Sequence, residues 1–159
     1  MLRSATEADL DVVASWITSS IDCELWAGPA LMFPLNRATL AHDIGLSSQT
    51  SFCLGEQNVE GFGQLVDKGS GRGHLAKVIV APQHRRMGRG SELVQALLEL
   101  AAERGFSVVG LNVRRDNDAA LLLYRKLGFD TAARPLTVSP SPGAEYMARN
   151  LTCVGADAP

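Results

Sequence analysis

The sequence predicts an α/β protein in which one mixed β-sheet carries helices on both faces. Its 159 residues suit one domain, placed at residues 1–154 with a frayed tail at 155–159. Because 46% of the residues are hydrophobic and 20% charged, the chain can bury a core, which excludes disorder for most of it. Hairpin strands followed by a β-α-β-α-β order favour a single mixed sheet.

The chain begins with a predicted strand over residues 2–5 and a helix over 7–19. Thr6 followed by Asp9 three positions later is typical of a capping box, which marks the start of the helix. Apolar residues then recur at helical spacing and would face the core: Leu10, Val13, Ile17 and Ile21.

Residues 22–35 combine Gly and Pro breakers with large apolar side chains, which predicts a loop. That loop either packs on the core or forms one wall of a binding site, since loops on rigid scaffolds often carry recognition. A second helix is predicted over 36–46, ending at Gly45.

The remaining elements follow from alternation, apolar runs and turn residues. Two strands of a hairpin flank a polar turn at 55–58, and the next strand is an apolar run bounded by turn residues. Two amphipathic helices alternate with further strands. The predicted strands cover 50–54, 59–67, 74–81, 106–113, 129–133 and 144–152, and the predicted helices cover 89–104 and 117–127.

Charge and cysteine usage exclude several classes of protein. Lys and Arg number 15 against 17 Asp and Glu, so nucleic acid is not an expected partner. Cys23, Cys53 and Cys153 are far apart and odd in number, which argues against a disulfide framework and against a metal site. The chain shows neither a signal peptide nor a long apolar run, so we expect a soluble cytoplasmic protein without membrane contacts.

A basic loop over residues 82–90 joins a predicted strand to a predicted helix. The first N–H groups of a helix lack partners within it, and the helix dipole adds positive charge there. Gly88 and Gly90 would let a phosphate approach the backbone, beside three arginines: Arg85, Arg86 and Arg89. The pattern is neither a P-loop nor G-x-G-x-x-G, so these residues alone leave open a pyrophosphate site and a solvated basic turn.

Two blocks of sequence resemble the GCN5-related N-acetyltransferase (GNAT) superfamily. Arg85-x-x-Gly88-x-Gly90, preceded by Val78-Ile79-Val80-Ala81-Pro82, is similar to the acetyl-CoA-binding motif R/Q-x-x-G-x-G/A. The second block is similar to N-x-x-A…L-Y-x-K-x-G-F and comprises Leu111-Asn112-Val113, Asn117-Asp118-Ala119-Ala120 and Leu123-Tyr124-Arg125-Lys126-Leu127-Gly128-Phe129. The resemblance implies the acyl-CoA N-acyltransferase fold, whose mostly antiparallel sheet has a splayed central strand pair.

The same resemblance implies acetyl-CoA as the cofactor. Backbone groups of the strand before the loop would pair with the pantetheine arm, at Val78, Ile79 and Val80. The loop and the helix start would hold the pyrophosphate, through Arg85, Arg86, Met87, Gly88, Arg89, Gly90 and Ser91. Asn117 would face the cofactor from the start of the next helix, a position where it is equally suited to cap that helix.

Tyr124 matches the tyrosine that serves the family as a general acid, and it would protonate the departing thiolate of CoA. A phenol of pKa about 10 can donate to a thiolate whose thiol has a pKa of about 8.5. A purely packing role for this ring stays open. Several relatives place a catalytic carboxylate at the position of His74, which makes His74 the matching base. An exposed structural histidine, with ordered water as the base, is the alternative.

The resemblance implies direct transfer of the acetyl group to a primary amine of a small molecule or peptide. We expect the acceptor site to be built from residues 22–36, 62–64 and 134–146, with Trp26, Phe33, Gln64 and Tyr146 as binding residues. The resemblance is compatible with a homodimer and leaves the oligomeric state open. The alternative functions are a non-catalytic acyl-CoA-binding or sensing module and a different phosphate-binding enzyme.

Overall fold

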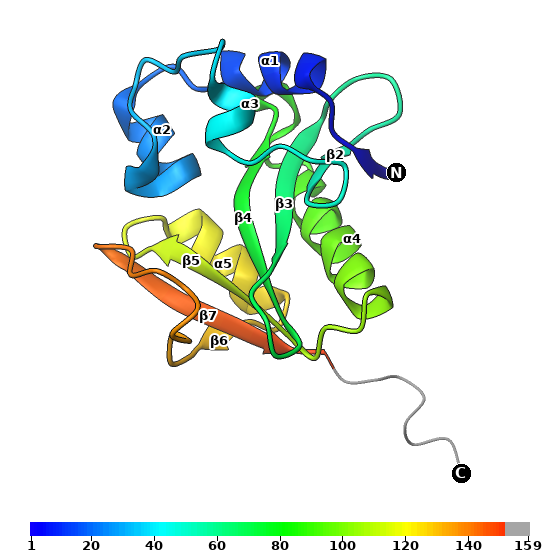
Figure 1. Ribbon diagram of the computed structural model, residues 1–159, viewed down its shortest axis with the longest axis vertical. Coiled ribbons are helices and arrows are strands. Elements are labelled where there is room, and N and C mark those ends of the chain that lie inside the picture. Colours follow the sequence, from blue (N-terminus) through cyan, green and yellow to red (C-terminus); the bar gives the residue numbers. More distant parts are fainter. Residues whose placement is uncertain (152–159) are drawn as a thin grey trace.

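The computed structural model describes residues 1–151, which form a seven-stranded sheet in the order β1-β2-β3-β4-β5-β7-β6 (Figure 1). Within the described chain, β4 and β5 form the one parallel pair, and the other neighbouring strands are antiparallel. The predicted mixed, mostly antiparallel sheet is therefore confirmed. The strands are β1 (Leu2–Ser4), β2 (Ser51–Leu54), β3 (Gly61–Asp67), β4 (Arg72–Val80), β5 (Val108–Arg114), β6 (Asp130–Thr131) and β7 (Ala144–Asn150).

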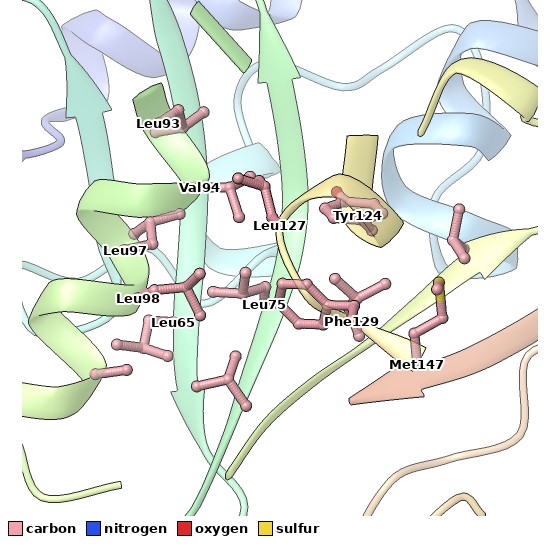
Figure 2. Close-up of a cluster of buried hydrophobic side chains, with 14 of the residues drawn as sticks. Leu65, Leu75, Leu93, Val94, Leu97, Leu98, Tyr124, Leu127, Phe129 and Met147 are labelled. Atoms are coloured by element: carbon pink, nitrogen blue, oxygen red, sulfur yellow. The ribbon is translucent and has the colours of Figure 1, made fainter. Parts of the chain in front are cut away.

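Helices cover both faces of this sheet, as predicted. On one face, α4 and α5 pack against inward-facing strand residues, and Figure 2 shows Leu97 of α4 directed toward the strands. On the other face, α1, α2 and α3 pack around Cys53 and Phe62 in a second cluster. The helices are α1 (Glu7–Ser15), α2 (Ser20–Ala27), α3 (Leu40–Asp43), α4 (Arg89–Glu103) and α5 (Asp118–Lys126), with short 3₁₀ turns η1 (Gly28–Ala30) and η2 (Pro82–His84).

The structure corrects the prediction for the first helix and the segment after it. The helix ends at Ser15, and Ser19 starts a new helix by accepting a hydrogen bond from the Asp22 N–H at 3.0 Å. Residues 20–27 are thus helical and not part of a loop. Ile21 belongs to this second helix and is 68% exposed, so its assignment to the core was wrong.

The helix predicted over 36–46 shrinks to the four residues of α3. Asn36 instead accepts from the Ala38 N–H at 3.0 Å through its side chain, which favours a turn over a helix start. Later elements lie within a few residues of their predicted bounds. The predicted last strand, 144–152, ends at Asn150, and both its final residue and the predicted tail at 155–159 lie outside the described residues.

The predicted capping box at the start of α1 is present and is extended by Arg3. The Asp9 carboxylate accepts from the Thr6 N–H at 2.8 Å and from two Arg3 nitrogens at 2.7 and 2.9 Å. The Arg3 hydrogen bonds, helped by the Thr6 contacts, lower the pKa of Asp9 to about 2. Asp9 therefore joins β1 to α1 in its ionised form.

This cluster predicts a pH-dependent contribution to stability. Because the pKa of Asp9 is lower in the folded state, its contribution is complete above the unfolded pKa of about 3.9 and is lost as the pH falls toward 2. We expect Asp9→Asn to reduce the free energy of unfolding by about 1–2 kcal/mol at pH 7 and by little at pH 2. Urea unfolding at both pH values measures this. A pH-independent loss, or an equal loss in the exposed control Asp11→Asn, would contradict it.

Two of the three cysteines lie in the described chain, and both are buried and unpaired. Burial raises the pKa of the Cys53 thiol to about 12, which makes it a poor nucleophile at neutral pH. Cys153 lies outside the described residues. Among residues 1–151, no helix is long and apolar enough to span a bilayer.

Candidate active site

The two central strands separate partway along the sheet. β4 and β5 pair only where Arg72–Leu75 runs beside Val108–Leu111. Beyond that point β4 stays with β3 as far as Val80, while β5 stays with β7 as far as Arg114, so the strands diverge (Figure 1). The predicted splay is confirmed, and it leaves one edge of residues 76–80 without a neighbouring strand.

Backbone groups at the end of β4 point into this gap. The Ala81 N–H donates to the Glu60 carbonyl at 2.9 Å, on the β3 side. Because successive N–H groups of a strand point to opposite edges, the Val80 N–H faces the gap. The Val80 carbonyl accepts from Arg85 Nε at 3.1 Å. The strand end therefore presents an N–H donor next to the basic loop.

The loop after β4 turns sharply into α4. Gly88 has φ of +79° and precedes the first helical residue, Arg89. A side chain is disfavoured at that φ even though a Cβ there would meet no atom within 4 Å, which identifies the backbone angle as the reason for glycine. At Gly90 a Cβ would lie 3.3 Å from Leu123 Cδ2, so a small residue is needed where α4 passes α5. These glycines leave the helix start uncovered.

A cavity of about 460 Å³ lies against this loop, and we call it the loop cavity. It brings together residues from both sequence blocks, which are far apart in the chain. Side chains of α2 and of the two residues that follow α1, Trp16 and Ile17, complete its wall. The lining residues are Trp16, Ile17, Asp22, Leu25, Trp26, Val78, Ile79, Val80, Arg85, Arg86, Gly90, Asn117, Ala119, Ala120, Leu123 and Tyr124.

Four residues predicted to hold the pyrophosphate do not line the loop cavity: Met87, Gly88, Arg89 and Ser91. Arg89 is instead ion-paired with Glu60 at 3.2 Å and with Glu92 at 2.7 Å. The Met87 side chain is 67% exposed. The cations at the cavity are therefore Arg85 and Arg86.

Tyr124 lies on α5 with its ring buried, only 8% exposed, and packs edge-to-face on Phe129 with ring centroids 5.6 Å apart. Figure 2 shows the two rings together in the core. Burial raises the pKa of Tyr124 to about 12, so the phenol keeps its proton at neutral pH. Among the described residues its hydroxyl makes no hydrogen bond within the protein, while the residue lines the loop cavity. That is the state a proton donor to a bound ligand needs.

Asn117 caps α5, as predicted, while its contact with the cofactor stays a prediction. Its side-chain oxygen accepts from the Ala120 N–H at 3.3 Å, which caps α5. The residue also lines the loop cavity.

A second cavity, of about 560 Å³, lies on the sheet face opposite α4, and we call it the His74 cavity. It is lined from β3, β4, β5, α2 and the 138–144 segment. His74 is 8% exposed, its ring stacks on Tyr146, and its Nδ1 atom has no hydrogen-bond partner in the described chain. Burial, followed by the charges of Lys68 and Lys77, lowers the pKa of His74 to about 4. The imidazole is therefore neutral at pH 7, and it is buried rather than exposed.

The predicted acceptor residues divide into two groups. Trp26 and Gln64 line the His74 cavity, where Gln64 is held by hydrogen bonds to the Ile44 carbonyl at 2.9 Å and to Ser51 Oγ at 3.0 Å. Tyr146 lines none of the described cavities; its ring stacks on His74, with ring centroids 6.4 Å apart, and fills the space above Gly110. Phe33 is 38% exposed and lines none of the described cavities.

The two cavities meet at the gap between β4 and β5. A small cavity of about 90 Å³ shares Asn117 and Tyr124 with the loop cavity, and Lys77 and Asn112 with the His74 cavity. Trp26 lines all three and donates from Nε1 to the Lys77 carbonyl at 2.8 Å. A ligand in the loop cavity can thus meet a second ligand at the splay.

Sequence reasoning missed several residues of these walls. Trp16 and Ile17 line the loop cavity from the connection after α1, and Leu25 lines it from α2, a helix whose residues 22–27 were expected to be a loop. Lys68 and Lys77 line the His74 cavity. Lys77 has φ of +53° at an irregular point of the β3–β4 register, which the apolar strand pattern gave no sign of.

The described residues fit an acyl-CoA. Two arginines lie at the loop side of the cavity for phosphates, and the free edge of β4 can pair with an amide-bearing arm. The buried phenol lies where the cavity meets the gap. This arrangement can hold an anion at one end and deliver a proton at the other.

A model of the acetyltransferase (GNAT) family matches residues 15–129. The chain belongs to the GNAT family. Members of this family are acetyl-CoA-dependent acyltransferases, which agrees with the fit of the loop cavity. The match extends well before the two sequence blocks and includes α2, the helix that closes over that cavity.

Known proteins are similar to this GNAT chain to different extents. The [ribosomal protein bS18]-alanine N-acetyltransferase of Escherichia coli (strain K12) is 38% identical over 58 residues, which cover 36% of this chain and 39% of that enzyme. The aligned stretch is thus less than two thirds of either protein.

Solved structures support the fold over nearly the whole chain. The crystal structure of the ribosomal-protein-S18-alanine N-acetyltransferase from Escherichia coli has a TM-score of 0.69 and 24% identity, covering 100% of this chain and 98% of that one. The PaiA N-acetyltransferase from Thermoplasma acidophilum, solved in complex with coenzyme A, has a TM-score of 0.71 and 16% identity, covering 95% and 98%. At these identities the likeness establishes the fold.

Proposed function

We propose that this protein transfers the acetyl group of acetyl-CoA directly to a primary amine. The observation that carries the proposal is the meeting of two cavities at the β4–β5 gap beside Tyr124. One cavity suits the acyl donor and the other suits the acceptor, and direct transfer needs both to reach one point. Proximity of this kind lowers the barrier because the reactants are already oriented.

Acetyl-CoA supplies a thioester as the acetyl donor. Arg85 and Arg86 bind its phosphates in this proposal, and the unpaired edge of β4 aligns its arm with the gap. The Val80 N–H donates to the thioester oxygen, where negative charge develops.

In this proposal, Tyr124 supplies the proton that the departing sulfur receives. As the bond from carbon to the acceptor nitrogen forms and the carbon–sulfur bond breaks, the phenol donates its proton to the sulfur. Because burial raises the pKa of Tyr124 to about 12, the hydroxyl carries its proton at neutral and mildly alkaline pH.

The amine must also lose a proton. His74 is the proposed acceptor of that proton, either directly or through water, since the imidazole is neutral in the His74 cavity. With a pKa of about 4 it is a weak base, so the surroundings of the amine must themselves favour its neutral form.

Release of free thiol from acetyl-CoA across a panel of primary amines tests the proposed function. We expect amine-dependent release with at least one acceptor, above a control lacking amine. Tight binding of CoA without thiol release for any amine would support the non-catalytic acyl-CoA-binding module instead.

A further inference from the structure

The His74 cavity contains an excess of positive charge. Lys68 and Lys77 line it, both are half-buried, and neither forms an ion pair among residues 1–151. Its one acidic lining residue, Glu24, is paired with Arg114 at 2.5 Å. Two ammonium charges are therefore left without a counter-charge from the described chain.

These charges act on one another. Burial, and next the charge of Lys68, lowers the pKa of Lys77, and both lysines also disfavour a charged His74. Like charges gathered in a half-buried space destabilise the folded protein unless a ligand neutralises them. The chain has only three lysines, and two of them line this cavity. Their presence here is therefore not explained by a generally lysine-rich surface.

The backbone at Lys77 is itself held in an unfavourable conformation. Its φ of +53° lies in the left-handed region, which costs free energy for a lysine. The Trp26 indole N–H fixes this turn by donating to the Lys77 carbonyl at 2.8 Å. Residues held in such sparsely populated backbone conformations cluster at active sites and ligand clamps.

We infer that the acceptor is a small amine that carries a carboxylate, and that Lys68 and Lys77 bind this carboxylate. The inference rests on the proposed acetyl transfer and names its acceptor class. A carboxylate would neutralise one of the two lysine charges, and the other still favours the uncharged form of the acceptor amine. A volume of about 560 Å³ is within the usual range for a small-molecule site.

The same charges select against polyamines. A polyamine keeps at least one ammonium group after its reacting nitrogen loses a proton, and that group would meet two lysines. Specificity here comes from repulsion of the wrong acceptor as well as attraction of the right one.

Initial rates with matched acceptors test the inference in the unmodified protein. Each L-amino acid is compared with its own carboxamide, and spermidine and tyramine are added. We expect kcat/KM for the best carboxylate acceptor to exceed that of its amide by about ten-fold or more, the worth of one charged hydrogen bond. Preference for an amide, spermidine or tyramine would overturn the inference and leave the proposed function intact.

Charge-removing variants locate the effect. In Lys68→Gln and Lys77→Gln, KM for the carboxylate acceptor should rise about ten-fold while KM for its amide and for acetyl-CoA changes little. Lys126→Gln, at the exposed end of α5, is the charge-matched control. Equal losses with the acid and the amide would indicate a structural role for the lysines and overturn the inference.

A binding measurement needs no turnover and separates this inference from the proposed function. With CoA present, N-acetylglycine should raise the melting temperature more than N-acetylglycinamide, and the difference should vanish in the double variant of Lys68→Gln and Lys77→Gln. Equal or absent stabilisation by the two compounds overturns the inference. Absence of thiol release with every amine, together with retained N-acetylglycine binding, would overturn the proposed function while supporting carboxylate binding by the two lysines.

Discussion

Tyr124→Phe is expected to lower kcat by about 100-fold or more, because a positioned general acid contributes 10²–10⁴-fold. The variant removes one oxygen and keeps the ring that packs on Phe129, so the buried cluster stays intact. In the described structure the hydroxyl makes no hydrogen bond within the protein, so its removal leaves no buried partner unsatisfied. The thiolate must then depart without a proton from the enzyme.

The control for this variant is the affinity for CoA, measured by calorimetry, which should change by less than about two-fold since the phosphate contacts lie elsewhere. The pH profile adds a second readout. Because the pKa of Tyr124 is about 12, the wild-type rate should not fall as pH rises through 10. Unchanged turnover in Tyr124→Phe would remove this residue from the mechanism.

The double variant Arg85→Ala/Arg86→Ala is expected to weaken CoA binding by about 100-fold. A charged hydrogen bond contributes about 1.5–3 kcal/mol, and these side chains are exposed, so about ten-fold for each arginine is the appropriate expectation. Both line the loop cavity, whereas Arg89 is already paired with Glu60 and Glu92. Arg89→Ala should therefore weaken binding far less than the double variant. Calorimetry with CoA and with dephospho-CoA measures these affinities.

Arg125→Ala is the matched control, since Arg125 lies at the far end of α5 from Asn117 and is 57% exposed. Its affinity for CoA should equal that of the unmodified protein. A larger loss in Arg89→Ala than in the double variant would show that the loop rearranges its ion pairs around the ligand and would refute the assignment of the phosphate contacts.

The second half of the chain was predictable because its signals are local. The apolar stripe of α4, the glycine after α5 and the Asn117 cap each act within one or two helical turns. The basic loop and Tyr124 could be placed at the starts and faces of their elements for the same reason, since they belong to short contiguous motifs.

The first half was less predictable because its elements are decided by competing local bonds and by tertiary contacts. Ser19 and Asp22 end one helix pattern and begin another, although Ile17 and Ile21 continue the spacing of the first. The position of Trp26 is fixed by its hydrogen bond to the carbonyl of Lys77 in β4, which lies 51 residues away in sequence. The left-handed backbone at Lys77 likewise depends on β3 and α2, and no pattern within β4 indicates it.

The splay of β4 from β5 divides the sheet into two parts, β1–β4 and β5–β7, which are joined by only four residue pairs. An extended ligand arm lying along the free edge of β4 would take the place of a missing strand and bridge those parts. Occupancy and resistance to heating are then linked, because a ligand that binds only the folded state stabilises it as its concentration rises above Kd. The gap between β4 and β5 that admits the ligand is thus also the gap that the bound ligand fills.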